Sequence, residues 1–345
     1  MLPKLISLFA HVVRRHAAAL SRGAHGPRIT LVLLVLVPLG WPQFVYGHGA
    51  ESVPGAPGWT WRWDVILTLT LALGVYLRGW LFLRRSGSRA AVLWRLGSYG
   101  VALTGLVVAL LSPVDALASE RLSMHMVQHV LLLMVAPLAI LLANPFGALL
   151  WGLPTSLRLR FASLFHQGTR SRKMARVLTF MPVAWGLYVL NLWGWHHPTL
   201  YQAALVNPWL HDLEHWLFFS TALLFWWPVV NVPPMLHGQI SLGLRIIYLV
   251  AATLQNTLLG MAISLPERIL YPFYDSASFS RSLSPIYDQG LGGGIMWVSG
   301  HMYLIPIVVL MATKLIAEDE AMDRADSKRQ MKGVRGSPLE RVPSG

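Results

Sequence analysis

The sequence of 345 residues contains no cysteine, which excludes disulfide bonds, thiolate metal sites and thiol redox chemistry. Charged residues are also scarce. They make up 12% of the chain, whereas a soluble domain carries about 25%. Hydrophobic residues make up 54%. This composition indicates a protein that buries most of its surface in lipid rather than in water.

Acidic residues are particularly few, at 15 against 28 Lys and Arg, so the formal net charge is +13 at pH 7. In a soluble protein this balance would suggest a nucleic-acid partner. Here the basic residues lie in short loops between apolar stretches, which indicates membrane orientation instead. We therefore expect the lipid bilayer, and no nucleic acid, as a partner.

Seven apolar stretches are each about long enough to cross a bilayer as a helix, which takes roughly 20 residues. They cover residues 61–83, 92–112, 122–143, 177–197, 209–230, 242–265 and 291–315. The sequence thus predicts an all-α fold, a polytopic membrane bundle of seven transmembrane helices. The segment 147–166 alternates apolar residues with Arg158 and Arg160, which predicts an amphipathic helix on the inner membrane surface.

Three regions follow from this pattern. Residues 1–47 begin with basic residues and continue into a short apolar run, which is typical of a signal peptide or signal anchor. Residues 48–316 form the predicted seven-helix membrane domain. Residues 317–345 mix both signs of charge without apolar periodicity, which predicts a disordered tail.

The loop charges predict the orientation. The segments 84–95, 144–176 and 229–245 carry Arg and Lys but no acidic residue. The alternate loops carry more acids than bases, namely Asp115, Glu120, Glu267, Asp275 and Asp288 against Arg121, Arg268 and Arg281. Under the positive-inside rule, the first set lies in the cytoplasm. The membrane domain then begins outside, crosses seven times and places the C-terminus in the cytoplasm.

Histidines gather near the predicted outer ends of these stretches. His125 and His129 are four residues apart, as are His211 and His215, so each pair shares one face of a helix. Ionisable side chains in hydrocarbon are costly and tend to mark function. The sequence therefore predicts one metal site in the outer leaflet, with these candidate ligands: His125, His129, His196, His197, His211, His215 and His301.

Copper is the metal that this donor set favours. Imidazole suits copper, zinc, iron and nickel, while thioether sulfur selects Cu(I), and methionines accompany several of the histidines. We expect His129, His215 and His301 to hold the ion. A layer nearer the surface would consist of His125, His196, His197 and His211.

Other motifs are weaker. The segment HDLEH at 211–215 fits the H-x-x-E-H pattern of some zinc peptidases, but the sequence shows neither a third ligand nor a cleft, so peptidase activity is disfavoured. The glycines at 292–294 predict close helix packing. Gln255 and Asn256 are expected to form hydrogen bonds between helices.

Five segments together resemble the CtaG-type cytochrome c oxidase assembly factor family over roughly residues 60–315. They are HMVQH, WGWHHPTLY, HDLEHWLFF ending in FWWP, YPFY and DQGLGGGIMW. The resemblance implies a non-enzymatic protein of the bacterial plasma (inner) membrane that supports copper insertion into the oxidase. Its partners would be cytochrome c oxidase subunits and periplasmic copper chaperones. It also adds Asp288 and Trp297 to the positions of interest.

Three alternatives remain open. A membrane di-iron oxygenase or desaturase has similar histidine clusters, but on the cytoplasmic side, which a topology reporter after Pro198 would detect. A haem-binding protein could use His129 and His301 as axial ligands and would show a Soret band. A copper transporter would use the same residues and would be recognised by transport into vesicles.

Overall fold

The computed structural model describes residues 58–276, 283–313 and 315–316. Within these residues the fold is all-helical and contains no strand, as the sequence predicts. The predicted signal or anchor segment, residues 1–47, and the predicted tail, residues 317–345, lie outside the described residues.

Five helices in the described ranges are long and apolar enough to cross a membrane. They are α3 (Trp63–Arg85), α4 (Leu93–Leu110), the helix Leu122–Leu142, α14 (Leu242–Ser264) and the helix Pro285–Thr313. Two further helices, α10 (Arg170–Leu178) and α11 (Met181–Trp195), have the length and composition of a sixth span when taken together, although they meet at a bend of 65°. The chain is therefore a membrane protein.

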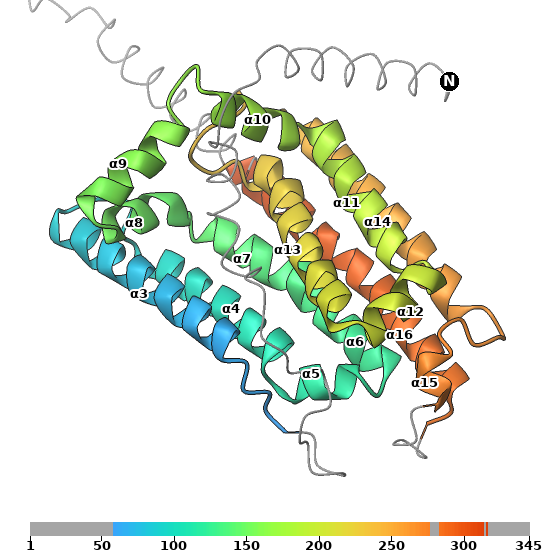
Figure 1. Cartoon of the computed structure of the whole chain (residues 1–345). Helices are drawn as coiled ribbons and strands as arrows, with labels where there is room; N and C mark the ends of the chain where they lie inside the picture. Colours follow the sequence, from blue (N-terminus) through green and yellow to red (C-terminus); the bar gives the residue numbers. More distant parts are fainter. Residues whose placement is uncertain (1–57, 277–282, 314, 317–345) are drawn as a thin grey trace, which may run out of the picture.

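The helix α13 (Pro208–Val230) has 23 residues, as many as α3 and α14, but it is not one of these five. Its first two turns contain His211, Asp212, Glu214 and His215. It runs through the middle of the bundle, in contact with α7 (Ala136–Leu142), α11 and α12 (Pro198–Val206) (Figure 1). A helix covered by its neighbours can bury polar groups that a lipid-facing helix cannot. All seven predicted stretches are thus helical, and seven crossings stay a prediction.

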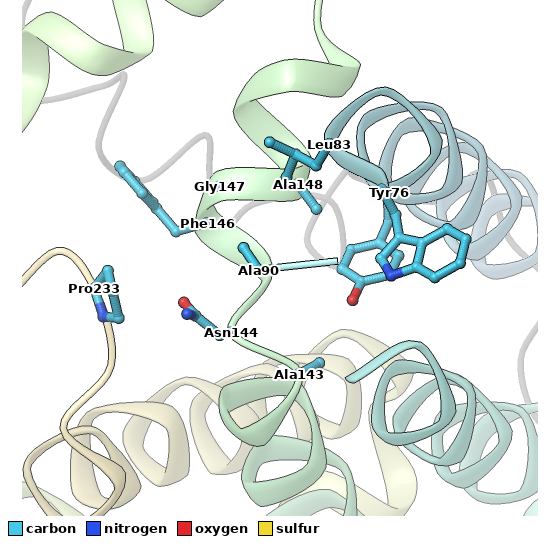
Figure 2. Close-up of a pocket in the computed structure, with 10 residues that line it drawn as sticks. Tyr76, Leu83, Ala90, Ala143, Asn144, Phe146, Gly147, Ala148 and Pro233 are labelled. Atoms are coloured by element: carbon cyan, nitrogen blue, oxygen red, sulfur yellow. The ribbon is translucent and has the colours of Figure 1, made fainter. Parts of the chain in front are cut away.

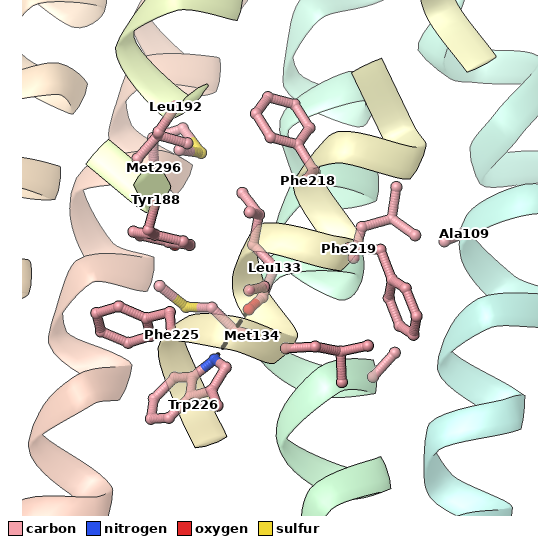
Figure 3. Close-up of a cluster of buried hydrophobic side chains, with 14 of the residues drawn as sticks. Ala109, Leu133, Met134, Tyr188, Leu192, Phe218, Phe219, Phe225, Trp226 and Met296 are labelled. Carbon is pink, nitrogen blue, oxygen red and sulfur yellow. Dashed lines mark hydrogen bonds between the residues drawn. The ribbon is translucent and has the colours of Figure 1, made fainter. Parts of the chain in front are cut away.

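The helix Leu122–Leu142 changes its winding halfway. It consists of α6 (Leu122–Val130), the π-helical turn η2 (Leu131–Val135) and α7. Pro137 has no backbone N–H, so the Leu133 carbonyl lacks the partner that an α-helix would provide. Trp226 of α13 replaces it, since its indole Nε1 donates to the Leu133 carbonyl at 3.0 Å (Figure 3).

Glycines allow α14 and α16 (Pro285–Gly300) to pack with their backbones in contact. A Cβ on Gly260 would lie 2.8 Å from the Gly293 carbonyl oxygen, and a Cβ on Gly293 would lie 2.7 Å from the Gly260 carbonyl oxygen. A side chain at either position would therefore separate the helices. The predicted packing role is confirmed for Gly293, whereas Gly294 has nothing within 4 Å of its Cβ position.

The two amides of α14 form the predicted hydrogen bonds between helices. The Asn256 side chain donates to the Met296 carbonyl of α16, and Gln255 Oε1 accepts a hydrogen bond from the Trp193 indole of α11 at 3.0 Å. Both predictions are confirmed. These bonds fix the rotation of α14 relative to its two neighbours.

Short helices lie at both ends of the bundle. At one end are α8 (Pro145–Gly152), α9 (Thr155–Leu164) and α10, and at the other are α5 (Pro113–Ala118), α12 and α15 (Phe273–Ser276) (Figure 1). The predicted amphipathic segment 147–166 forms α8 and α9, and α9 buries none of its residues. This helix carries Arg158 and Arg160, so the basic loops gather at the α8–α10 end.

A cavity of about 220 Å³ lies at this basic end, where α8 meets α3 (Figure 2). Its wall includes the aromatic rings of Tyr76, Trp80 and Phe146, together with the Asn144 side chain. Tyr76 stacks on Tyr99 of α4 with ring centroids 3.8 Å apart. The cavity contains none of the predicted ligands and is separate from the histidines.

Candidate metal centre

Five of the seven predicted histidines converge inside the bundle. His125 and His129 come from α6, His211 and His215 come from α13, and His196 directly follows α11. Their exposed fractions range from 0% to 6%, so the cluster is closed to solvent. Ring centroids lie 4.4 Å apart for His125 and His129, 4.1 Å for His211 and His215, and 5.1 Å for His125 and His211. The predicted convergence of imidazoles from separate helices is confirmed.

His125, His211 and His215 form what we call the outer group, nearer the N-terminal ends of α6 and α13. One ring nitrogen from each of these residues lies within 4.8 Å of the other two. His125 Nε2 and His211 Nε2 are 3.3 Å apart. Metal–imidazole bonds are about 2.0–2.1 Å long for zinc, so three nitrogens at this spacing can surround one ion with small side-chain adjustments.

His125, His129 and Glu214 form what we call the inner group, whose three candidate ligand atoms also lie within 4.8 Å of one another. Glu214 has an exposed fraction of 0%, and its Oε1 lies 3.5 Å from His129 Nε2. In the described part of the chain, neither Glu214 oxygen accepts a hydrogen bond. A buried carboxylate without donors is costly, which makes this group a natural partner for a cation.

Glu214 was absent from the ligands predicted from the sequence. The signal that could have identified it is its spacing on α13. It lies three residues after His211, so the two side chains share one face of the helix. The pattern HDLEH fits a peptidase motif and one of the family segments, but neither identifies its glutamate as a ligand.

Hydrogen bonds orient two of the histidine rings. His125 Nδ1 lies 2.9 Å from the Tyr274 hydroxyl, which itself donates to the Ala118 carbonyl at 3.1 Å. His196 Nδ1 donates to the Leu192 carbonyl at 2.8 Å. In both rings Nδ1 is therefore the donor and Nε2 faces the cluster. This is the usual arrangement of histidine ligands, whose second nitrogen donates to an oxygen outside the site.

Side chains from neighbouring elements hold α6 in place. Asp288, at the start of α16, accepts hydrogen bonds from the Leu122 backbone N–H at 2.7 Å and from the Ser123 hydroxyl. Gln128, between the two histidines of α6, donates to Asp115 Oδ1 of α5 at 2.8 Å. These bonds fix the position of α6 along the bundle and its rotation about its own axis. They therefore also fix the direction of its two imidazoles.

An apolar floor separates the cluster from the rest of the bundle. The Phe218 ring lies 4.6 Å from the His129 ring, measured between centroids. Phe218 belongs to a buried cluster that includes Leu133, Phe219 and Trp226 (Figure 3). The floor excludes water from below, so charges in the cluster interact more strongly than they would in solvent.

The remaining two predicted ligands lie outside the cluster. His197 is exposed at the start of α12. His301 is exposed as well, and its Nδ1 lies 3.2 Å from the Trp297 carbonyl oxygen of the preceding turn. Neither residue belongs to the outer or the inner group. The expected set of His129, His215 and His301 is therefore not brought together, because α16 turns His301 outward.

Two further acids near the site, Asp64 and Asp212, contact an arginine. Arg62, which precedes α3, lies 2.8 Å from Asp212 and 3.4 Å from Asp64, measured between guanidinium nitrogen and carboxylate oxygen. Met126 and Met296, which supported copper in the sequence, both belong to the hydrophobic core. Glu214 is thus the acid that the fold directs into the histidine cluster.

Two mycobacterial relatives are similar to most of the chain. An uncharacterized protein of Mycobacterium bovis is 28% identical over 276 residues, which cover 75% of this chain and 40% of that protein. An uncharacterized protein of Mycobacterium leprae is 24% identical over 272 residues, which again cover 75% of this chain and 40% of that protein. This chain therefore spans less than half the length of these relatives.

No solved structure matches the chain. Residues 74–318 match the family described as cytochrome c oxidase caa3 assembly factor. The match covers most of the chain, including α6, α11, α13 and α16, which carry or support the histidine cluster. The chain belongs to the cytochrome c oxidase caa3 assembly factor family.

Proposed function

We propose that this protein binds one copper ion at the outer group and supports the insertion of copper into cytochrome c oxidase. The observation that carries the proposal is the outer group itself, in which three buried imidazoles from two helices offer nitrogens within 4.8 Å of one another. Membership of an oxidase assembly family implies association with the oxidase. Periplasmic copper chaperones would supply the ion.

Copper is favoured by the donor set and by the family. Imidazole nitrogens are common copper ligands, and the outer group offers three of them. Burial of the outer group protects a bound ion from solvent, and Tyr274 fixes the His125 ring for coordination. The role is to hold and transfer the ion, and no step of catalysis is assigned.

The proposed membrane arrangement has seven crossings, including α11 and α13. The basic helices α9 and α10 then face the cytoplasm, together with the C-terminus, and the histidine cluster lies in the outer leaflet. In this arrangement α6 and α13, which carry four of the clustered histidines, enter the membrane from the same side. This supports a common depth for their histidines. The membrane would be the bacterial inner membrane.

Copper binding tests the function directly. Purified wild-type protein is expected to take up one Cu(I) per chain in competition with a colorimetric Cu(I) chelator. The double variant His211→Ala/His215→Ala should lose this binding, because only one outer ligand remains. The matched control, His197→Ala/His301→Ala, removes two exposed imidazoles and should bind as the wild type does. Equal retention of Cu(I) by both double variants would reject the outer group.

A topology reporter after Pro198 tests the placement. An extracytoplasmic signal supports an assembly factor that receives copper outside, whereas a cytoplasmic signal would favour the di-iron oxygenase alternative. The haem alternative relied on His129 and His301, and these residues lie in different surroundings, one fully buried and the other exposed. A Soret band in purified protein would reopen it.

A further inference from the structure

The hydrogen bonds around the inner group require a proton or a metal ion between His129 and Glu214. His196 Nδ1 lies 2.8 Å from the Leu192 carbonyl, and a carbonyl only accepts, so Nδ1 carries the hydrogen. In the neutral ring, His196 Nε2 is then an acceptor. His129 Nδ1 lies 3.4 Å from it and must be the donor of this pair.

The tautomer of His129 leaves two acceptors facing each other. With its hydrogen on Nδ1, the neutral His129 ring presents a lone pair at Nε2. This nitrogen lies 3.5 Å from Glu214 Oε1, and both atoms are fully buried. Two lone pairs at this distance repel unless a proton or a metal ion lies between them.

The surroundings favour a metal ion over a proton. A proton needs two partners, whereas here a third atom, a ring nitrogen of His125, lies within 4.8 Å of both His129 and Glu214. The second oxygen of Glu214 also lacks a donor among the described residues. Two imidazoles and one carboxylate form a donor set for a divalent first-row ion, harder than the three imidazoles of the outer group.

His125 belongs to both groups but can serve only one ion at a time. Its Nδ1 is held by Tyr274, and its Nε2 lies 3.3 Å from His211 Nε2, so Nε2 is the nitrogen that we expect to turn from this contact to a bound ion. We propose that the outer and inner groups are two alternative positions for one ion, which share His125 as the pivot ligand. An ion would move inward by exchanging His211 and His215 for His129 and Glu214 while it stays bound to His125.

The donor chemistry separates the two positions. Cu(I) prefers the outer group, which offers imidazole alone, while a divalent ion can also use the carboxylate of the inner group. This inference rests on the proposed function for the outer position. The inner position can be tested independently with Zn²⁺, a divalent ion without redox chemistry.

The experiment starts from the full-length double variant His211→Ala/His215→Ala, purified in detergent and stripped of metal. It is expected to lose Cu(I) binding but to retain one Zn²⁺ per chain, measured by elemental analysis after desalting. Adding Glu214→Gln should abolish the retained Zn²⁺. The control Glu267→Gln, which makes the same chemical change at an exposed acid, should leave the Zn²⁺ in place.

Two results would overturn the proposal. One is a double variant that binds no Zn²⁺, which would mean that the cluster holds a single ion position and that a proton lies between His129 and Glu214. The other is a triple variant that keeps its Zn²⁺ despite Glu214→Gln. If the double variant does not fold, His211→Gln replaces it and is judged by the same two results. Absence of Cu(I) binding in the wild type would reject the proposed function. The Zn²⁺ measurement would still test the inner position independently.

Discussion

Replacement of Asp288 by alanine should weaken both the fold and the metal site. This buried carboxylate accepts hydrogen bonds from the Leu122 N–H and the Ser123 hydroxyl at the start of α6. Each hydrogen bond to a charged group contributes roughly 1.5–3 kcal/mol. Asp288→Ala should therefore lower the free energy of unfolding by about 3 kcal/mol or more, and Asp288→Asn, which keeps an acceptor oxygen, by roughly half as much.

The assay combines stability and binding on the same samples. Unfolding by sodium dodecyl sulfate in mixed micelles, followed by tryptophan fluorescence, reports the change in free energy. Cu(I) competition then reports whether α6 still presents His125 to the outer group. The control is Asp275→Ala, because Asp275 is an exposed carboxylate on the neighbouring α15.

The three variants should differ in stability and in Cu(I) affinity in one fixed order. Stability should fall in the order wild type, Asp288→Asn, Asp288→Ala, with Asp275→Ala close to the wild type. Cu(I) affinity should fall in the same order, because the N-terminal anchor of α6 positions the histidines. An Asp288→Ala protein that is as stable as the Asp275→Ala control would refute the assigned role of this carboxylate.

Three further changes probe the support of the site. Trp226→Phe removes the donor to the buried Leu133 carbonyl and should cost about 1–3 kcal/mol in the same unfolding assay; an unchanged midpoint would contradict it. Gly293→Ala should destabilise the α14–α16 contact, whereas Gly294→Ala should be neutral or stabilise by up to about 1 kcal/mol. Burial lowers the pKa of His237, outside the helices, below its usual value near 6.5, so the unfolded chain binds this proton more readily. Stability should then fall as pH drops below about 6.5, and less steeply in His237→Gln, as thermal melts across pH 5–7.5 can show.

The helices could be predicted from the sequence because lipid imposes a simple requirement. A stretch of about 20 apolar residues has to be helical when no water can satisfy its backbone. The same rule accounts for α13, whose polar first turns lower its hydropathy but not its helicity. The convergence of His125, His129, His211 and His215 was also accessible, since a spacing of four places each pair on one face.

The rotation of each helix about its axis could not be predicted in this way. The depth of His301 along its helix suggested a ligand, but the contact of Gly260 with Gly293 sets the face that α16 turns to the bundle, and His301 is left exposed. Glu214 shows the converse. Its spacing was visible in the sequence, but only the packing of α6 against α13 brings it to His129.

The π-helical turn between the two halves of the third apolar stretch acts as an angular offset. Each residue of an α-helix advances the helix by about 100°. The extra residue wound into η2 therefore lets the histidine-bearing half and the Ala136–Leu142 half face directions that a regular helix of this sequence could not combine. A one-residue deletion within Leu131–Val135 would preserve the hydrophobicity and span length almost unchanged. It would let η2 close into a regular α-helical turn and leave the two halves nearly in phase, whereas the same deletion within α6 or α7 would rotate the imidazoles by about 100° relative to the lower half.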